Sequence, residues 1–248
     1  MSVCFAYFPS VPNGRRDANA AANQALGLPE HRGAGRLAVV GGGSSINDHI
    51  EELRNFRGTI WAVNGTINWC LDHGIDAYFY TIDAQPIENW TYDLSRIDKA
   101  VLAIDCDPSL FEKLKGADVS TLVASDGGPT SANSADLLSL QAGYVGVTFY
   151  GCESSFGEST HAYQSHPVPG WIDVRVGGET YRTKPEFLEQ ARVMAEVIRT
   201  IPKFYSERSG GLLRAMVKHS MDYELIAVSH DVAARLIDRR QELEAIGA

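Results

Sequence analysis

Three glycines and two serines follow an apolar run and precede an amphipathic stretch in "LAVVGGGSSINDHIEELRNF" (37–56). Glycines let a backbone approach a phosphate closely, and the N-terminus of the helix predicted from Ser45 adds a favourable dipole. The sequence therefore predicts a phosphate-binding turn made of Gly41, Gly42, Gly43, Ser44 and Ser45. The alternative is a tight strand-to-helix turn in which Ser44 or Ser45 caps the helix.

Two common phosphate-binding motifs do not match this turn. A dinucleotide fingerprint reads G-x-G-x-x-G, but Ile46 stands at the third glycine position. Asn64, rather than an acidic residue, ends the second predicted strand. A P-loop is excluded because no G-K-[ST] follows the glycines. Binding of NAD and Walker-type binding of nucleoside triphosphates are both disfavoured.

Small or hydrogen-bonding residues follow the other predicted strands as well. Asn64 could read a base or ribose edge, and Asp83 could hold a ribose hydroxyl or a divalent cation. Thr130 and Ser131 open a helix after a second glycine-rich turn, which offers a second anion-binding N-terminus. The whole set is Asn64, Gly65, Asp83, Gln85, Asp105, Asp107, Asp126, Gly127, Gly128, Thr130, Ser131, Glu153, Ser154 and Ser155. Each of them could instead cap a helix or form a turn.

Two histidines lie in a long polar segment that follows the sixth predicted strand. A histidine with a pKa near neutrality is the default general base for a hydroxyl nucleophile. The candidate catalytic residues are His161, His166, Asp126 and Glu153. Basic residues late in the chain offer a phosphate or carboxylate clamp, or a solvated helix face: Arg182, Lys184, Arg208, Arg214 and Lys218.

Hydrophobic patterning predicts the elements that must position these residues. Short β-branched or aromatic runs predict strands at 37–41, 59–63, 77–82, 99–104, 119–124 and 145–150. Helical patterns lie between most of them, at 45–56, 66–73, 108–115 and 131–142. This alternation predicts an α/β, Rossmann-like fold with a mostly parallel sheet flanked by helices. Ligands bind beyond the carboxyl ends of such strands, so the polar strand ends are expected to meet at one edge.

The alternation stops after Gly151. A long polar loop (151–170) and a β-hairpin around Gly177-Gly178 form an insertion after the sixth strand. A further helix is predicted at 184–201, with an apolar face made of Phe187, Leu188, Ala191, Met194, Ile198 and Ile201. A short strand at 203–206, a helix from about Gly211 and a terminal helix from about Asp231 complete the predicted elements. The predicted organisation is an N-terminal arm (1–35) with a short strand at 3–8, a Rossmann-like domain (36–227) and a C-terminal helix (228–248).

Composition narrows the class of protein. A formal net charge of −9 over 248 residues disfavours nonspecific binding to nucleic acid. The four widely spaced cysteines argue against a disulfide framework or a zinc knuckle, and for a reducing cytoplasm. No apolar run approaches the roughly 20 residues of a membrane span, and the N-terminus lacks the basic start of a signal peptide. A cytoplasmic protein is expected. The sequence does not determine its oligomeric state, and a homo-oligomer is compatible with it.

With these residues in place, the chain resembles the 6-hydroxymethylpterin diphosphokinase-like proteins (the MptE-like family) and the related motility-accessory glycosyltransferases. More distantly it resembles bacterial sialyltransferases that use CMP-activated sugars. The resemblance covers about residues 36–218 and is carried, in consistent order, by "VVGGGSSI", "AVNGT", "YTIDAQP", "GGPTS", "YGCESSFGESTHAY", "VRVGGETYRTKPEFL" and "SERSGG".

The resemblance implies a nucleotide bound at the glycine turn, with Gly42, Gly43 and Ser44 on phosphate. It also implies that Asn64 and Asp83 hold ribose, base or metal, and that Thr130 and Ser131 meet the nucleotide from the opposite side. His161 would lie at the reacting centre. The chain departs from the family at Gly151-Cys152-Glu153, where Gly-x-Asp is frequent, and at Pro129-Thr130-Ser131, where Gly-Ser is frequent.

Three functional hypotheses follow. The first is a glycosyltransferase that uses a CMP-type nucleotide sugar, with a histidine base for the acceptor hydroxyl. The second is a pyrophosphokinase that moves diphosphate from ATP to a pterin alcohol, with Mg²⁺ on carboxylates such as Asp83, Asp105 or Asp126. The third is a nucleotide-binding protein without turnover. The sequence slightly favours the first, because the long loop and hairpin leave room for a bulky acceptor.

Overall fold

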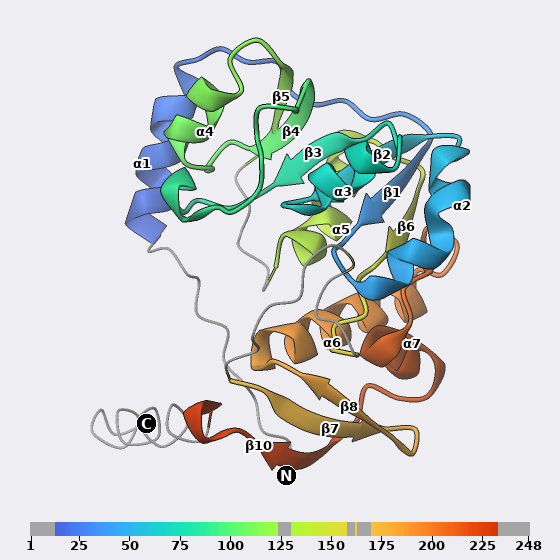
Figure 1. Cartoon of the computed structure of the whole chain (residues 1–248). Coiled ribbons are helices and arrows are strands. Elements are labelled where there is room, and N and C mark those ends of the chain that lie inside the picture. The colour runs from blue at the N-terminus through green and yellow to red at the C-terminus, as the bar shows by residue number, and fades with distance from the viewer. Residues whose placement is uncertain (1–12, 124–129, 158–161, 163–169, 233–248) are drawn as a thin grey trace.

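The chain folds around a seven-stranded sheet in which every pair of neighbouring strands is parallel. The computed structural model describes residues 13–123, 130–157, 162 and 170–232. The strands are β1 (Arg36–Val40), β2 (Thr59–Val63), β3 (Tyr78–Thr81), β4 (Lys99–Ala103), β5 (Asp118–Leu122), β6 (Gly146–Tyr150) and β9 (Tyr205–Glu207). The six strands predicted before residue 151 and the short later strand are confirmed, as is the Rossmann-like α/β class (Figure 1).

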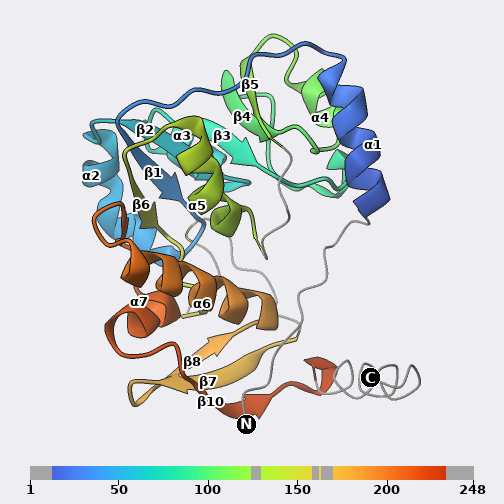
Figure 2. The ribbon, with the colours of Figure 1, turned by 180° about the vertical axis from the view of Figure 1, so that it is seen from behind.

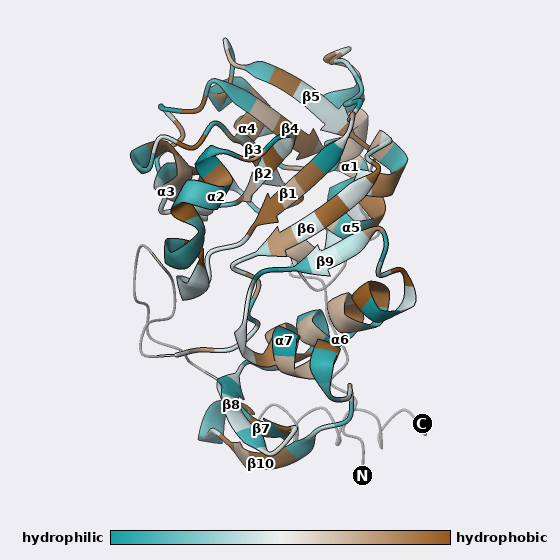
Figure 3. Cartoon of the chain, turned by 90° about the vertical axis from the view of Figure 1, so that its right-hand side faces the viewer, coloured by the Kyte–Doolittle hydropathy of each residue, from teal (hydrophilic) through white to brown (hydrophobic). Residues whose placement is uncertain are grey.

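Helices cover both faces of this sheet, which explains the nearly continuous apolar runs of its strands. The helical elements of this part are η1 (Ser44–His49, a 3-10 helix), α2 (Ile50–Arg54), α3 (Thr66–Asp72), η2 (Ile87–Asn89, also 3-10), α4 (Pro108–Lys113) and α5 (Ser131–Ala142). Helices α2 and α3 lie in front of the sheet in Figure 1, and α5 lies in front of it in the opposite view (Figure 2). The apolar residues of β1 and β6 are visible between these layers in Figure 3.

The strand order is β5-β4-β3-β2-β1-β6-β9. The chain adds strands in one direction from β1 to β5, and α5 then carries it back to the other side of β1. Strand β1 pairs with β2 on one side and with β6 on the other, in register from Arg36↔Gly146 to Val40↔Tyr150. The carboxyl ends of β1 and β6 therefore form the topological switch point, where ligands bind in sheets of this class.

A second, antiparallel sheet follows the long loop. It contains β7 (Ile172–Val176), β8 (Glu179–Thr183) and β10 (Glu224–Val228), in the order β10-β7-β8. The predicted hairpin is confirmed: Gly177 and Gly178 have φ values of 59° and 89°, as a type I′ turn requires. Strand β10 was not predicted, because it pairs with a strand more than 45 residues earlier and only that pairing defines it.

Helices α6 (Pro185–Thr200) and α7 (Gly211–Lys218) pack between the two sheets. The apolar face predicted for α6 is confirmed at Leu188, Ala191, Met194 and Ile198, which are all buried. Ile201 does not belong to this face: it follows the last residue of α6 and is 44% exposed.

Two further differences concern helices. The single helix predicted at 45–56 is instead η1 followed by the short α2, because Ser44–His49 forms a tighter 3-10 turn after the glycines. The predicted N-terminal arm contains an unpredicted helix, α1 (Asn13–Gln24), which packs beside α4. The strand predicted at 3–8 and most of the terminal helix predicted from Asp231 lie outside the described residues.

Aromatic side chains fill the centre of the core. Trp61 and Tyr80, from neighbouring strands, are stacked with ring centroids 4.7 Å apart, and both are fully buried. Such a pair contributes about 0.5–1.5 kcal/mol beyond its buried area. Among the described helices, none has the length and apolar character needed to cross a membrane.

Candidate functional site

A cavity of about 150 Å³ lies at the switch point. Its walls are the glycine turn after β1, Asn64 after β2, the first residues of α5, and the segment 151–156 after β6. Phe187 and Gln190 of α6 close one side. The structure thus brings together nine of the strand-end residues that the sequence singled out: Gly41, Gly42, Gly43, Asn64, Thr130, Ser131, Glu153, Ser154 and Ser155.

The glycine turn is held against the end of β6 by backbone hydrogen bonds. The N–H of Gly41 donates to the carbonyl oxygen of Tyr150, and the N–H of Gly43 donates to that of Gly151, each over 2.8 Å. A Cβ at position 41 would lie 2.6 Å from the carbonyl oxygen of Gly151. Two of the N–H groups predicted to face phosphate therefore continue the sheet pairing, and glycine at position 41 allows the two backbones to approach.

The carboxylate of Glu153 lies directly against this turn. Its Oε1 accepts a 2.6 Å hydrogen bond from the N–H of Ser45. A Cβ at position 43 would lie only 1.3 Å from Oε2, so the glycine at this position provides the space that Glu153 occupies. Glu153 is 8% exposed, and its Oε2 is buried with no hydrogen-bond partner among the described residues.

Asn64 provides a second unpartnered acceptor. Its N–H donates to the carbonyl oxygen of Tyr80 on the neighbouring strand β3, while its buried Oδ1 has no partner in the described part of the chain. Asn64 has φ of 50° and Ser154, also in the cavity wall, has φ of 56°. These are the two described non-glycine residues with left-handed backbone, a conformation that costs of order 1–3 kcal/mol and tends to gather at functional sites.

The N-terminus of α5 forms the opposite wall. Thr130 caps the helix, with its Oγ1 accepting from the N–H of Asn133 over 3.3 Å. Ser131 and Ala132 line the cavity, and the N–H groups of such first-turn residues have no acceptor inside the helix. Helix α5 has 12 residues, so its N-terminus carries a full helix dipole.

A buried amide connects the walls of the cavity. Gln190 Nε2 donates to Ser154 Oγ over 2.7 Å, and Gln190 Oε1 lies 2.5 Å from Thr130 Oγ1, which donates to it. Thr183 Oγ1 donates to the carbonyl oxygen of Ser154 over 2.5 Å. This network fixes the start of α5, the left-handed Ser154 and the second sheet relative to one another.

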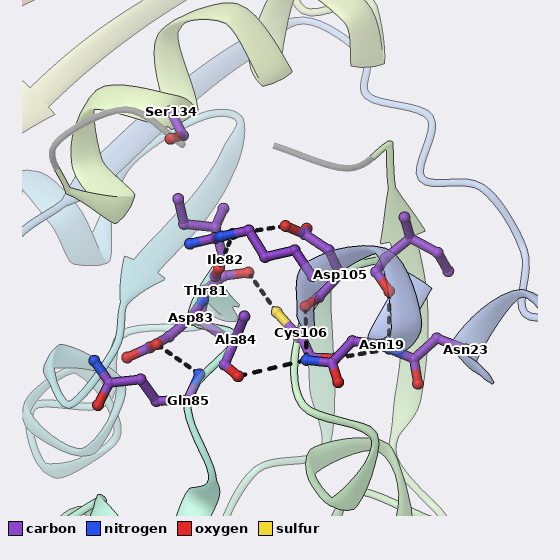
Figure 4. Close-up of polar contacts among 12 residues, drawn as sticks. Asn19, Asn23, Thr81, Ile82, Asp83, Ala84, Gln85, Asp105, Cys106 and Ser134 are labelled. Carbon is purple, nitrogen blue, oxygen red and sulfur yellow. Dashed lines mark hydrogen bonds and ion pairs between the residues drawn. The ribbon is translucent and has the colours of Figure 1, made fainter. Parts of the chain in front are cut away.

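Two of the carboxylates predicted as Mg²⁺ ligands, Asp83 and Asp105, lie outside this cavity, at the ends of β3 and β4. Asp105 is 1% exposed and forms a 2.6 Å ion pair with Arg16 of α1. Asp83 accepts from the N–H of Gln85 over 3.0 Å in a local turn (Figure 4). Burial raises the pKa of Asp83, against the opposing effects of the Gln85 N–H and the charge of Arg16.

These carboxylates do not fit a magnesium site in this arrangement. Asp105 already has a cation at hydrogen-bond distance, and the charge of Arg16 also acts on Asp83. The described residues contain no group of three or more His, Cys, Asp or Glu side chains placed to hold a metal ion.

The remaining predicted residues include serines and a glycine at the starts of helices and arginines that are paired with carboxylates. Ser44 begins η1, Ser45 donates its N–H to Glu153, and Gly65 precedes α3. Arg182 pairs with Asp173 through two bonds of 2.9 and 3.0 Å, and Arg214 pairs with Glu207, so both cations have carboxylate partners. The predicted Asp126, Gly128, His161 and His166 lie outside the described residues.

Sequence reasoning missed the contribution of α6. Gln190 is buried and hydrogen-bonded to the cavity walls, and Phe187, predicted only as part of the apolar face of the helix, lines the cavity. A polar residue on the apolar side of an amphipathic helix was the available signal, since a buried amide needs hydrogen-bond partners. Arg16 was missed because α1 itself was not predicted.

A comparison with protein-family models and with curated proteins finds no match for this chain. The fold and the cavity define the class: a Rossmann-like α/β protein with a polar cavity at its topological switch point. The MptE-like assignment stays a prediction from the sequence motifs.

Proposed function

We propose that this protein is a nucleotide-dependent transferase, and specifically a glycosyltransferase that uses a CMP-type nucleotide sugar. The observation that carries the proposal is the cavity at the switch point, whose walls include the N-terminus of the 12-residue helix α5. The same walls contain Glu153 and Asn64, whose Oε2 and Oδ1 atoms have no hydrogen-bond partner among the described residues. A helix N-terminus suits a phosphate, and buried acceptors suit the hydroxyl groups of a sugar. Both groups belong to a nucleotide sugar.

In the proposed reaction, an acceptor hydroxyl attacks the anomeric carbon of the donor sugar. The bond between that carbon and the phosphate oxygen breaks, and its electron pair leaves with the nucleotide phosphate. N–H groups at the start of α5 would stabilise the charge that develops on the phosphate. The proton of the acceptor hydroxyl goes to a general base, for which His161 and His166 stay the proposed residues, with Asp126 and Glu153 as carboxylate alternatives.

The diphosphokinase hypothesis receives less support from the described residues. It needs carboxylates free to hold Mg²⁺ between phosphates, whereas Asp105 is paired with Arg16. The structure also gives no specific observation that favours a nucleotide-binding protein without turnover. Of the three hypotheses, transfer from a nucleotide sugar is therefore the one that we propose.

A ligand panel tests the proposal. Thermal unfolding would be followed with CMP, UMP, ATP and GDP at increasing concentration, each with and without Mg²⁺. We expect CMP to raise the melting temperature without Mg²⁺, since a ligand at 100 times its Kd stabilises by about 2.7 kcal/mol. Stabilisation by ATP only in the presence of Mg²⁺, with no response to CMP, would contradict the glycosyltransferase and favour the diphosphokinase.

A further inference from the structure

The cavity has a wall that favours hydrogen-bond donors, and this wall includes the glycine turn. The N–H groups of Gly41 and Gly43 are bonded to β6, and that of Ser45 is bonded to Glu153 Oε1. Glu153 lines the cavity beside this turn, and its second carboxylate oxygen is buried and has no partner among the described residues. Asn64, at the end of β2, adds the acceptor Oδ1, which likewise has no partner within the described part of the chain.

The opposite wall favours anions. Ser131 and Ala132 stand in the first turn of α5, whose N–H groups carry the positive end of the helix dipole. By contrast, η1 after the glycine turn has six residues, and the N–H of Ser45 in its first turn is already bonded to a carboxylate. The two sides of the cavity therefore suit different groups: the anion end, at the N-terminus of α5, suits a negatively charged group, and the acceptor end, at Glu153, suits a hydrogen-bond donor.

From this polarity we infer that the site binds a hydroxyl-bearing phosphate ester with its phosphate at the N-terminus of α5 and a sugar hydroxyl donating to Glu153 Oε2. This orientation is the reverse of the one predicted from the glycine turn, and it rests on the proposed nucleotide-binding function. A phosphate at the glycine turn would meet the carboxylate of Glu153, and like charges at short range repel. The cavity volume, about 150 Å³, is comparable to one that holds a single benzene ring, so it suits the sugar ring.

The two ends can be tested separately by calorimetric titration of the full chain. The probes are CMP, 2′,3′-dideoxy-CMP, ribose 5-phosphate and inorganic phosphate. Glu153→Gln keeps the size of the side chain and removes its charge, and Glu153→Ala removes the side chain. Ser131→Pro removes one N–H at the first helical position, where proline is well tolerated, and Ser131→Ala keeps that N–H while removing the hydroxyl.

At the acceptor end, we expect Glu153→Gln to lower the affinity for CMP and for ribose 5-phosphate about tenfold, because a charge-assisted hydrogen bond is replaced by a neutral one. The affinities for dideoxy-CMP and inorganic phosphate should not fall. The preference for CMP over dideoxy-CMP should therefore be smaller in this variant than in the wild type. At the anion end, Ser131→Pro should weaken every probe relative to Ser131→Ala. Thermal melting of each variant verifies that it is folded.

The outcomes separate this inference from the proposed function. Tighter binding of all phosphate probes by Glu153→Gln or Glu153→Ala would place the phosphate at the glycine turn and overturn the orientation, while nucleotide binding stands. Equal affinities of the two Ser131 variants would also overturn it. If ribose 5-phosphate shows the expected pattern but no nucleotide binds, the orientation stands and the nucleotide function fails. No binding by any probe to the wild type overturns both.

Discussion

At the scale of single residues, the side chain of Glu153 accounts for the glycine at position 43. Gly43 has φ of −70°, which any residue can adopt, so its backbone does not require glycine. The requirement comes from the carboxylate of Glu153, which fills the space of a Cβ at that position. The sequence predicted that the glycines of this turn let a phosphate approach. It could not show that a carboxylate of the same chain, 108 residues after Ser45, lies against the turn.

This pairing predicts the outcome of a double-mutant cycle. We expect Gly43→Ala to destabilise the fold by about 1–3 kcal/mol, the usual cost of forcing an extra methyl group into a packed site. In a Glu153→Ala background the same change should cost much less, because the clashing carboxylate is gone. Urea unfolding of the four proteins measures the coupling.

The control for this cycle is Gly14→Ala. Gly14 lies in α1, and a Cβ there would meet nothing within 4 Å. This change should stabilise the protein by up to about 1 kcal/mol through helix propensity. Equal costs of Gly43→Ala in both backgrounds would show that Glu153 is not the reason for the glycine.

At the scale of elements, helix α1 is the main part of the fold that the sequence did not predict. It docks on the carboxyl ends of β3 and β4 through side-chain amides. Asn19 donates to the carbonyl oxygens of Ala84 and Asp105, and Asn23 donates to those of Ile104 and Cys106. Figure 4 shows these amides reaching the strand ends. A polar helix with buried asparagines has no clear apolar stripe, which is why the pattern did not predict it.

The ion pair between α1 and β4 gives a prediction with a matched control. Arg16→Ala should destabilise the protein by about 3 kcal/mol, since it removes the cation paired with a carboxylate that is 1% exposed. Arg15→Ala removes a neighbouring pair with Asp107, in which the arginine side chain is 47% exposed, and should cost under about 1 kcal/mol. Urea unfolding compares the two, and similar losses would contradict a special role for Arg16.

At the scale of the whole molecule, the segment between α1 and β1 runs along the top of the view in Figure 1, from α1 past β5 to the start of β1. His31 of this segment is buried, with Nδ1 2.9 Å from Ser120 Oγ and Nε2 2.9 Å from Tyr144 Oη. Its ring also packs edge-on against Trp61. One residue of the predicted arm thus joins strand β5 to the segment before β6, on opposite sides of β1.

His31 makes the stability of the whole fold depend on pH. Burial lowers the pKa of His31 from its ordinary value of 6.5, against a smaller opposing effect of Asp118. The unfolded chain therefore binds a proton below pH 6.5 that the folded chain resists, and stability is lost as pH falls from 6.5 toward the folded pKa. The loss is at most about 1.4 kcal/mol for each pH unit in that interval.

Comparison with His31→Gln isolates this effect, because the variant has no titrating group at position 31 while all other groups titrate in both proteins. The difference in unfolding free energy between wild type and variant should be constant above pH 7 and should shift in favour of the variant toward pH 5. Guanidinium unfolding at several pH values measures it. A difference that does not change with pH would show that His31 titrates normally.

The sequence by itself determined the strands other than β10, most of the helices, the hairpin and the parallel arrangement, because periodicity and turn residues act within a few positions of the chain. It also indicated that polar residues of several strand ends share one edge. Only the tertiary structure decided that Glu153 lies on the glycine turn, that Arg16 pairs with Asp105, and that α6 closes the cavity. These contacts join residues that are tens of positions or more apart, and packing rather than local preference sets them. The chemistry of the site depends on which groups remain without a partner after folding, and that is a property of the whole structure.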